Sequence, residues 1–89
     1  MNNKQLNIMR KINILSYKIT ELEHMNNLYM RNYEIMHSSE YMNSTTLSIG
    51  DYEKVINKLI NKIKRNELKI HKCSVELEKL QQKLVQIQM

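Results

Sequence analysis

The residues able to perform acid–base, nucleophilic or metal chemistry are few and scattered. The three histidines, His24, His37 and His71, are far apart, and none has Cys, Asp or Glu beside it at a metal-ligand spacing. The single cysteine, Cys73, cannot form an intrachain disulfide and repeats in step with apolar residues, so we interpret it as a packed thiol. The only glycine is Gly50, which leaves no glycine-rich phosphate loop. We therefore expect no catalytic, cofactor-binding or metal-binding residues and no enzyme activity.

A regular series of cations indicates a different chemistry, the recognition of an anionic surface. The chain has 14 Lys and Arg against 9 Asp and Glu, a net charge of +5. A solvated helix face is the simplest explanation of such a series, and docking onto an acidic protein surface is the functional one. We do not expect nucleic acid as the partner, because aromatic residues do not interleave with the cations and lysine greatly outnumbers arginine. The series recurs every seven residues, at Lys58, Arg65, Lys72 and Lys79, with Lys54, Lys64 and His71 beside it.

The elements that carry these residues are helices, because apolar residues recur in alternating steps of three and four. Each half of the chain contains one such series, or seam, and each seam is interrupted by a single asparagine. With no Pro, Trp or Phe, the composition favours few, long helices. The first seam is Ile8, Ile12, Leu15, Ile19, Leu22, Asn26, Tyr29, Tyr33 and Met36, and the second is Tyr52, Ile56, Leu59, Ile63, Asn66, Ile70, Cys73, Leu77, Leu80, Leu84 and Ile87.

The two asparagines predict how the seams face each other. If Asn26 lies opposite Asn66, facing residues have position numbers that sum to 92. Every other seam residue of the first half then meets one of the second, for example Ile12 and Leu80, and the turn centre falls at residue 46. A polar pair in an apolar seam sets the register at some cost in stability. The sequence therefore predicts an all-α fold, two long helices in an antiparallel coiled-coil hairpin, with Asn26 and Asn66 as register-setting residues.

The expected boundaries follow from residues that compete with the helical backbone. Residues 38–50 are rich in Ser, Thr and Asn, which favour turns and helix caps. Ser48 and Asp51 match a capping box. We expect one domain over 1–89, with helix 1 at about 3–40, a loop at about 41–48 and helix 2 at about 49–88.

A second apolar row lies outside the seam of the first helix, at Ile14, Leu28, Ile35 and Met42. An aligned row of this kind predicts another packing face. A hairpin of two helices buries one side of each and is marginally stable alone, so it should bind a partner or associate with itself. No apolar run approaches the roughly 20 residues that span a bilayer, and we expect a cytoplasmic protein.

The pattern resembles the FliJ/SctO-type stalk proteins of type III secretion export ATPases, which are bacterial coiled-coil hairpins. The resembling segments are Met9-Arg10-Lys11-Ile12, the entry to the second helix at Leu47-Ser48 and Asp51-Tyr52-Glu53, and the stretch from Leu77 to Gln88. The chain is shorter than is usual in that family.

The resemblance implies a stalk or adaptor at the inner-membrane secretion apparatus. Its partners would be the hexameric export ATPase, reached by the paired helix ends, and the export gate. Two alternatives remain open: a small secretion chaperone that binds an amphipathic helix of a secreted subunit, and a structural coiled-coil segment of a larger protein. The resemblance makes basic residues near the open end candidates for ATPase contact: Lys4, Arg10, Lys11, Lys79 and Lys83.

Overall fold

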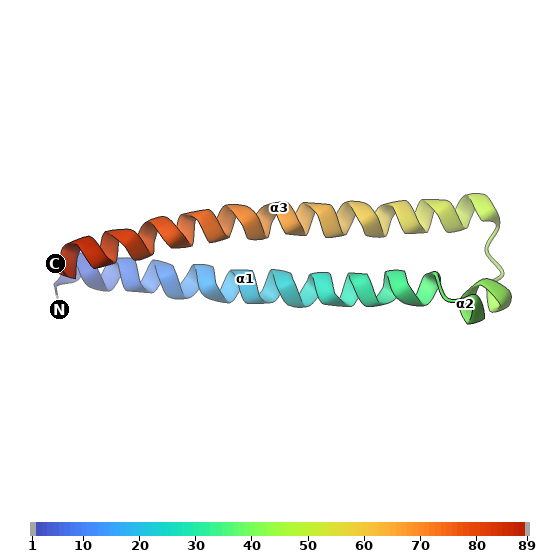
Figure 1. Ribbon diagram of the computed structural model, residues 1–89, viewed down its shortest axis with the longest axis horizontal. Helices are drawn as coiled ribbons and strands as arrows, with labels where there is room; N and C mark the ends of the chain where they lie inside the picture. The colour runs from blue at the N-terminus through green and yellow to red at the C-terminus, as the bar shows by residue number, and fades with distance from the viewer. Residues whose placement is uncertain (1, 89) are drawn as a thin grey trace.

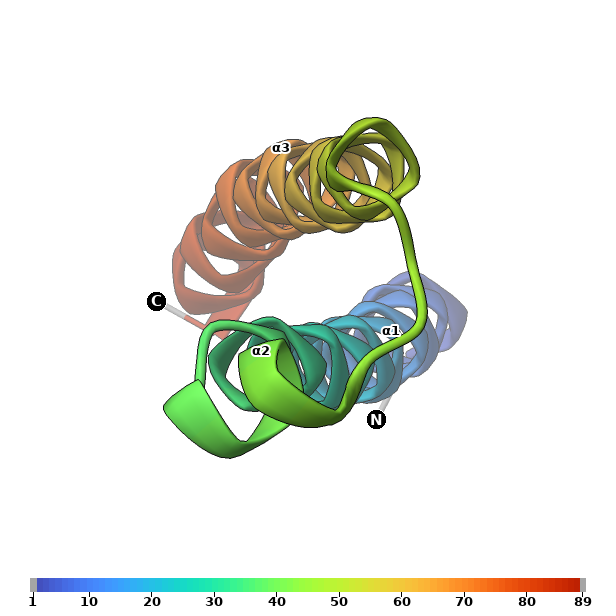
Figure 2. The ribbon, with the colours of Figure 1, turned by 90° about the vertical axis from the view of Figure 1, so that its right-hand side faces the viewer.

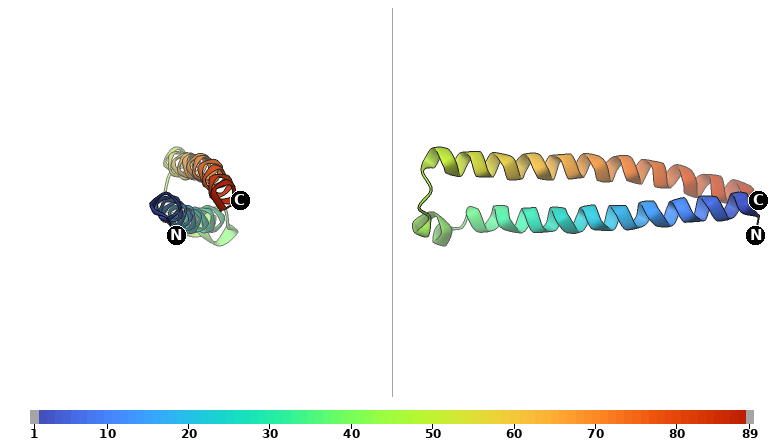
Figure 3. Two further views of the ribbon diagram at one scale, coloured as in Figure 1. Left: turned by 90° about the vertical axis from the view of Figure 1, so that its left-hand side faces the viewer. Right: turned by 180° about the vertical axis from the view of Figure 1, so that it is seen from behind.

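The computed structural model describes residues 2–88, which form a hairpin of two long helices. The helices are α1 (Asn3–Met36), α2 (Ser39–Ser44) and α3 (Ile49–Gln88). Helices α1 and α3 run antiparallel, side by side over their whole length, in a body 61 Å long and 17 by 16 Å across (Figures 1 and 3). No strand occurs between residues 2 and 88. The predicted all-α hairpin is confirmed.

Both long helices begin at side-chain caps. At the start of α1 the Asn2 side chain accepts a hydrogen bond from the Gln5 amide (2.8 Å), and the Gln5 side chain accepts one from the Asn2 amide (3.2 Å). Ser48 Oγ accepts a hydrogen bond from the Asp51 amide (3.2 Å), and α3 begins at the next residue, Ile49. Each cap provides an acceptor for an amide that has no partner within the helix. The predicted start of the second helix is confirmed.

The end of the first helix differs from the expected boundary near residue 40. Helix α1 stops at Met36, and residues 39–44 of the expected helix end and loop form α2 instead. Ser38 explains the break, because its backbone is extended and its hydroxyl donates to the Ile35 carbonyl (2.6 Å). The same hydroxyl accepts from the Tyr41 amide (3.2 Å), so it ends one helix and caps the next.

The turn joins the two long helices through α2 and residues 45–48, which contain the expected turn centre (Figure 2). The Tyr52 hydroxyl donates to the Met36 carbonyl at 2.7 Å and ties the first turns of α3 to the end of α1. Aromatic rings surround this bond, with centroids 6.2 Å apart for His37 and Tyr52 and 6.4 Å for Tyr41 and Tyr52. The turn end is therefore packed as well as linked.

The core is the predicted pair of seams. All twenty seam positions are buried or half-buried. None of the described side chains is less than 2% exposed, because two helices cover only one side of each other. The most buried seam residues are Ile8, Leu22, Asn26 and Met36 of α1 and Ile56, Asn66, Cys73 and Leu80 of α3.

Contacts between the helices agree with the predicted register. The Asn26 side-chain amide donates to the Ile63 carbonyl at 3.3 Å, one turn from Asn66. Ile8 shares a groove with Leu80 and Ile87, which bracket its expected partner Leu84. Facing residues therefore lie about equally far from position 46 along the chain.

Candidate binding surface

The basic stripe of α3 is fully accessible. Lys58, Arg65, Lys72 and Lys79 are all exposed, and they lie on one side of α3 because they are seven residues apart. Two grooves between the helices show which residues of α1 lie beside them.

Both grooves open on the same side of the hairpin. One is lined by Lys4 and Lys11 of α1 and by Lys83 of α3. The other is lined by Lys11 and Ile14 of α1 and by Lys79 and Lys83 of α3. The stripe of α3 therefore shares a side with Lys4 and Lys11.

The seven-residue repeat extends this side along the molecule. Positions that repeat Lys4, Lys11 and Ile14 on α1, and Lys79 and Lys83 on α3, carry ten of the chain's 14 Lys and Arg residues, all exposed. Only three acidic residues, Glu21, Asp51 and Glu76, occupy the same positions, so the net charge there is +7. We call the ten cations the basic face: Lys4, Lys11, Lys18, Lys58, Lys62, Arg65, Lys69, Lys72, Lys79 and Lys83.

The opposite side of the hairpin is acidic. A groove there is lined by Met30, Ile60, Lys64 and Glu67. Lys64 was expected beside the stripe of α3. It lies instead on the opposite side of the hairpin. The repeat positions of these residues, together with the α1 row of Glu34, which lies one helical turn after Met30 on the same side, carry one cation, Lys64, against five carboxylates, a net charge of −4. The carboxylates are Glu23, Glu34, Glu53, Glu67 and Glu78.

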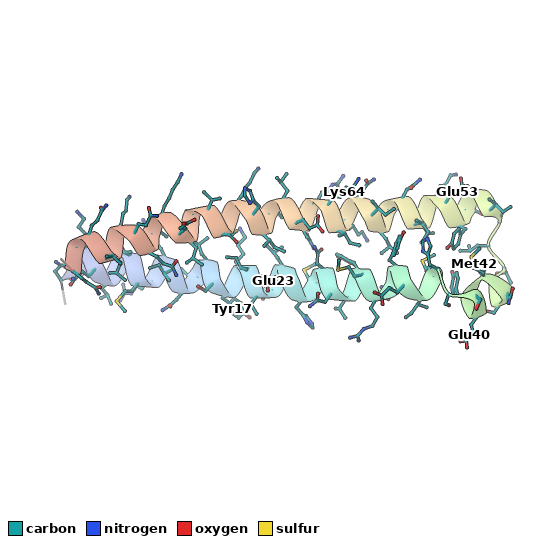
Figure 4. All side chains as sticks on the ribbon, viewed as in Figure 1. Tyr17, Glu23, Glu40, Met42, Glu53 and Lys64 are labelled. Carbon is teal, nitrogen blue, oxygen red and sulfur yellow. The ribbon has the colours of Figure 1, made fainter. Side chains whose placement is uncertain are left out.

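Arg10 is separated from the other candidate cations at the open end. It lines neither basic groove. It precedes Tyr17 by seven residues, and the labelled Tyr17 side chain, which is 67% exposed, extends away from α3 (Figure 4). Lys4, Lys11, Lys79 and Lys83 are thus brought together, whereas Arg10 occupies the back of α1.

The predicted apolar row is exposed. Ile14 is 67%, Leu28 45% and Ile35 52% exposed. Met42 is also exposed, but it belongs to α2 and lies beyond the end of the row on α1. Ile14 lines a groove together with Lys79 and Lys83, and Leu28 and Ile35 follow it at multiples of seven residues. The apolar row therefore runs along α1 on the same side as the basic face, with Glu21 at its remaining position.

Three members of the basic face were missed by sequence reasoning: Lys18, Lys62 and Lys69. Each directly flanks a seam, and the signal was available in the predicted register. In an antiparallel pair, the residue just before a core position on one helix lies on the same side as its counterpart on the other helix. The Lys62 ammonium also lies 5.5 Å from the centre of the Tyr29 ring, a cation–π contact across the two helices.

The residues considered for acid–base or metal chemistry remain dispersed. Across the described part of the chain, no three His, Cys, Asp or Glu side chains are grouped to hold a metal ion. Cys73 is a buried free thiol. None of the helices between residues 2 and 88 combines the length and hydropathy required to cross a bilayer. In comparisons with known proteins, no protein-family model, no curated protein and no solved structure matches this chain.

Proposed function

We propose that this protein is a non-catalytic coiled-coil adaptor that docks onto an acidic protein surface through its basic face. The observation that supports this proposal is the segregation of charge, with a net charge of +7 on one side of the hairpin and −4 on the other. Charge gathered on one side speeds association with an oppositely charged surface and disfavours other partners.

Within that role we propose a stalk that couples an export ATPase to a type III secretion apparatus. An elongated body of 61 Å with a packed turn at one end suits a part that bridges two partners. Its place would be the cytoplasm of a bacterium, at the inner-membrane apparatus. The family resemblance supports this assignment.

A small secretion chaperone is the second candidate. The observation that favours it is the exposed row of Ile14, Leu28 and Ile35 beside the basic face, since an amphipathic helix of a secreted subunit would cover such a row.

The test compares two variants that remove the same charge. One carries Lys58→Gln, Arg65→Gln and Lys72→Gln on the basic face. The control carries Arg31→Gln, Lys54→Gln and Lys64→Gln elsewhere. Glutamine keeps helix propensity, so both should retain the circular dichroism of the native chain. Each tagged chain is used to capture partners from the native cell.

We expect the basic-face variant to bind its captured partner about tenfold or more weakly, with the control unchanged. Capture of an export ATPase whose hydrolysis the native chain stimulates would support the stalk. Capture of a secreted subunit alone would support the chaperone. If both variants bind the partner equally well, the basic face is only a solvated surface, and the proposed adaptor function is contradicted.

A further inference from the structure

The side of the hairpin that carries the basic face also carries apolar side chains, and these have no cover within the hairpin. The row of Ile14, Leu28 and Ile35 is about half exposed or more, and Met25, which directly flanks the seam on the same side, is 42% exposed. Four sizeable apolar side chains therefore line the α1 edge of a surface whose α3 edge is cationic.

Two grooves open on this side near the open end of the hairpin, and the rows that line them continue along it by the seven-residue repeat. One groove is lined by Lys11 and Ile14 of α1 and by Glu76, Lys79 and Lys83 of α3, so the cationic and apolar rows are within reach of a single ligand. Both rows repeat every seven residues, which corresponds to about 10 Å along a helix. The surface and a helix laid along it would share that repeat.

We infer that this side of the hairpin binds an acidic amphipathic α-helix of a partner protein, which lies lengthwise along the basic face. Its apolar stripe would cover Ile14, Leu28 and Ile35, and its carboxylates would face the lysines of α3. The result is a three-helix arrangement that also shields the half-buried seam from solvent. This inference rests on the proposed adaptor function and names the element that the adaptor binds.

Two other occupants fit the surface less well. A nucleic acid would neutralise the lysines but leave the apolar row without an apolar partner. A second copy of this chain, related by a two-fold axis through the same face, would bring a net charge of +7 against another +7.

The test uses the full chain and three designed peptides of about four heptads each. The first has Leu at the two core positions of each heptad and Glu beside them, so that charge repulsion keeps it monomeric. The second replaces those Leu residues by Ser, and the third replaces the Glu residues by Lys. A mixed-sequence DNA duplex is the fourth probe, and binding is measured by fluorescence anisotropy.

The variants separate the apolar contribution from the electrostatic one. Ile14→Gln, Leu28→Gln and Ile35→Gln together remove the apolar row. The matched control carries Leu68→Gln, Val75→Gln and Val85→Gln, which alters exposed apolar side chains elsewhere on α3. Because all six positions are exposed, both triple variants should fold.

We expect the Leu/Glu peptide to bind best, and the apolar-row variant to weaken it about tenfold with the matched control unchanged. Equal binding of the Leu/Glu and Ser/Glu peptides, no effect of the apolar-row variant, or tighter binding of DNA would each overturn the inference. If binding of the native partner still requires the basic face, those results contradict the inferred helix but not the adaptor function. If the Lys/Arg→Gln variant of the basic face still binds both the Leu/Glu peptide and the native partner normally, the adaptor function and the inferred acidic helix are both contradicted.

Discussion

Asn26 and Asn66 form a polar layer in the middle of an otherwise apolar interface. They are 6% and 7% exposed, and Asn26 donates one hydrogen bond, to the Ile63 carbonyl at 3.3 Å. Asn26 Oδ1 and Asn66 Nδ2 are buried without a hydrogen-bond partner among the described residues. An unpaired buried polar atom costs about 1–3 kcal/mol, so this layer lowers stability while it fixes the register.

Replacing both asparagines by leucine tests that balance. The Asn26→Leu, Asn66→Leu double variant should raise the free energy of unfolding by about 1–3 kcal/mol, because two orphaned polar atoms leave the core. Register or oligomeric state should become less uniform, which sedimentation would reveal alongside thermal unfolding. Asn27→Leu with Asn61→Leu, at exposed positions, is the control and should change little. A sharp loss of stability in the core variant would contradict the pairing.

For individual residues, the sequence predicts burial in the interface, which depends on periodicity. It does not predict hydrogen bonds between side chains and the backbone of the other helix. The spacing of Leu22, Asn26 and Tyr29 was sufficient to predict that all three lie in the interface. The bond from Asn26 to the Ile63 carbonyl could not be predicted, since every residue has the same carbonyl and only the local approach of the helices selects one.

Among the elements, serines set the helix ends on either side of the turn. Ser48 was recognisable as a cap because Asp51 follows at the capping-box distance, and α3 begins where that motif predicts. The end of α1 was placed about four residues late. Ser38 is one of several Ser, Thr and Asn residues in that segment, and the sequence does not reveal which of them leaves the helical conformation.

Removing the cap of α3 should be measurable. Ser48→Ala deletes the acceptor of the Asp51 amide and should lower the free energy of unfolding by about 1 kcal/mol, measured by denaturant titration. Ser74→Ala, at an exposed position within α3, is the matched control and should be neutral or slightly stabilising, because alanine is the better helix former. An equal loss in both variants would show that the Ser48 cap contributes nothing.

For the whole molecule, the arrangement of charge depends on which helix faces meet. The stripe of α3 can be read from the sequence. That Lys4, Lys11 and Lys18 lie on the same side as the stripe follows only when the residues that flank the two seams are placed by the antiparallel pairing. The same pairing moves Lys64 to the acidic side and leaves Arg10 at the back of α1. The basic face, the adaptor proposal and the inferred acidic helix all follow from this one geometry.

A distance measured within one molecule therefore tests the antiparallel hairpin itself. Nitroxide labels would be placed at Asn7→Cys and Gln86→Cys, two exposed positions that line one groove, in a chain with Cys73→Val. Labels at Asn7→Cys and Asn57→Cys provide the control pair. Pulsed electron spin resonance would be recorded with excess unlabelled chain, so that only distances within one molecule contribute.

In the hairpin, the Asn7–Gln86 labels are expected to lie within about 25 Å of each other, because packed helix axes are 8–10 Å apart. The control pair should be separated by about 40 Å, given a rise of 1.5 Å per helical residue. A single straight helix through Thr46 would instead place Asn7 and Gln86 roughly 120 Å apart. A short distance that disappears on dilution with unlabelled chain would also contradict the hairpin, because the contact would then lie between two molecules.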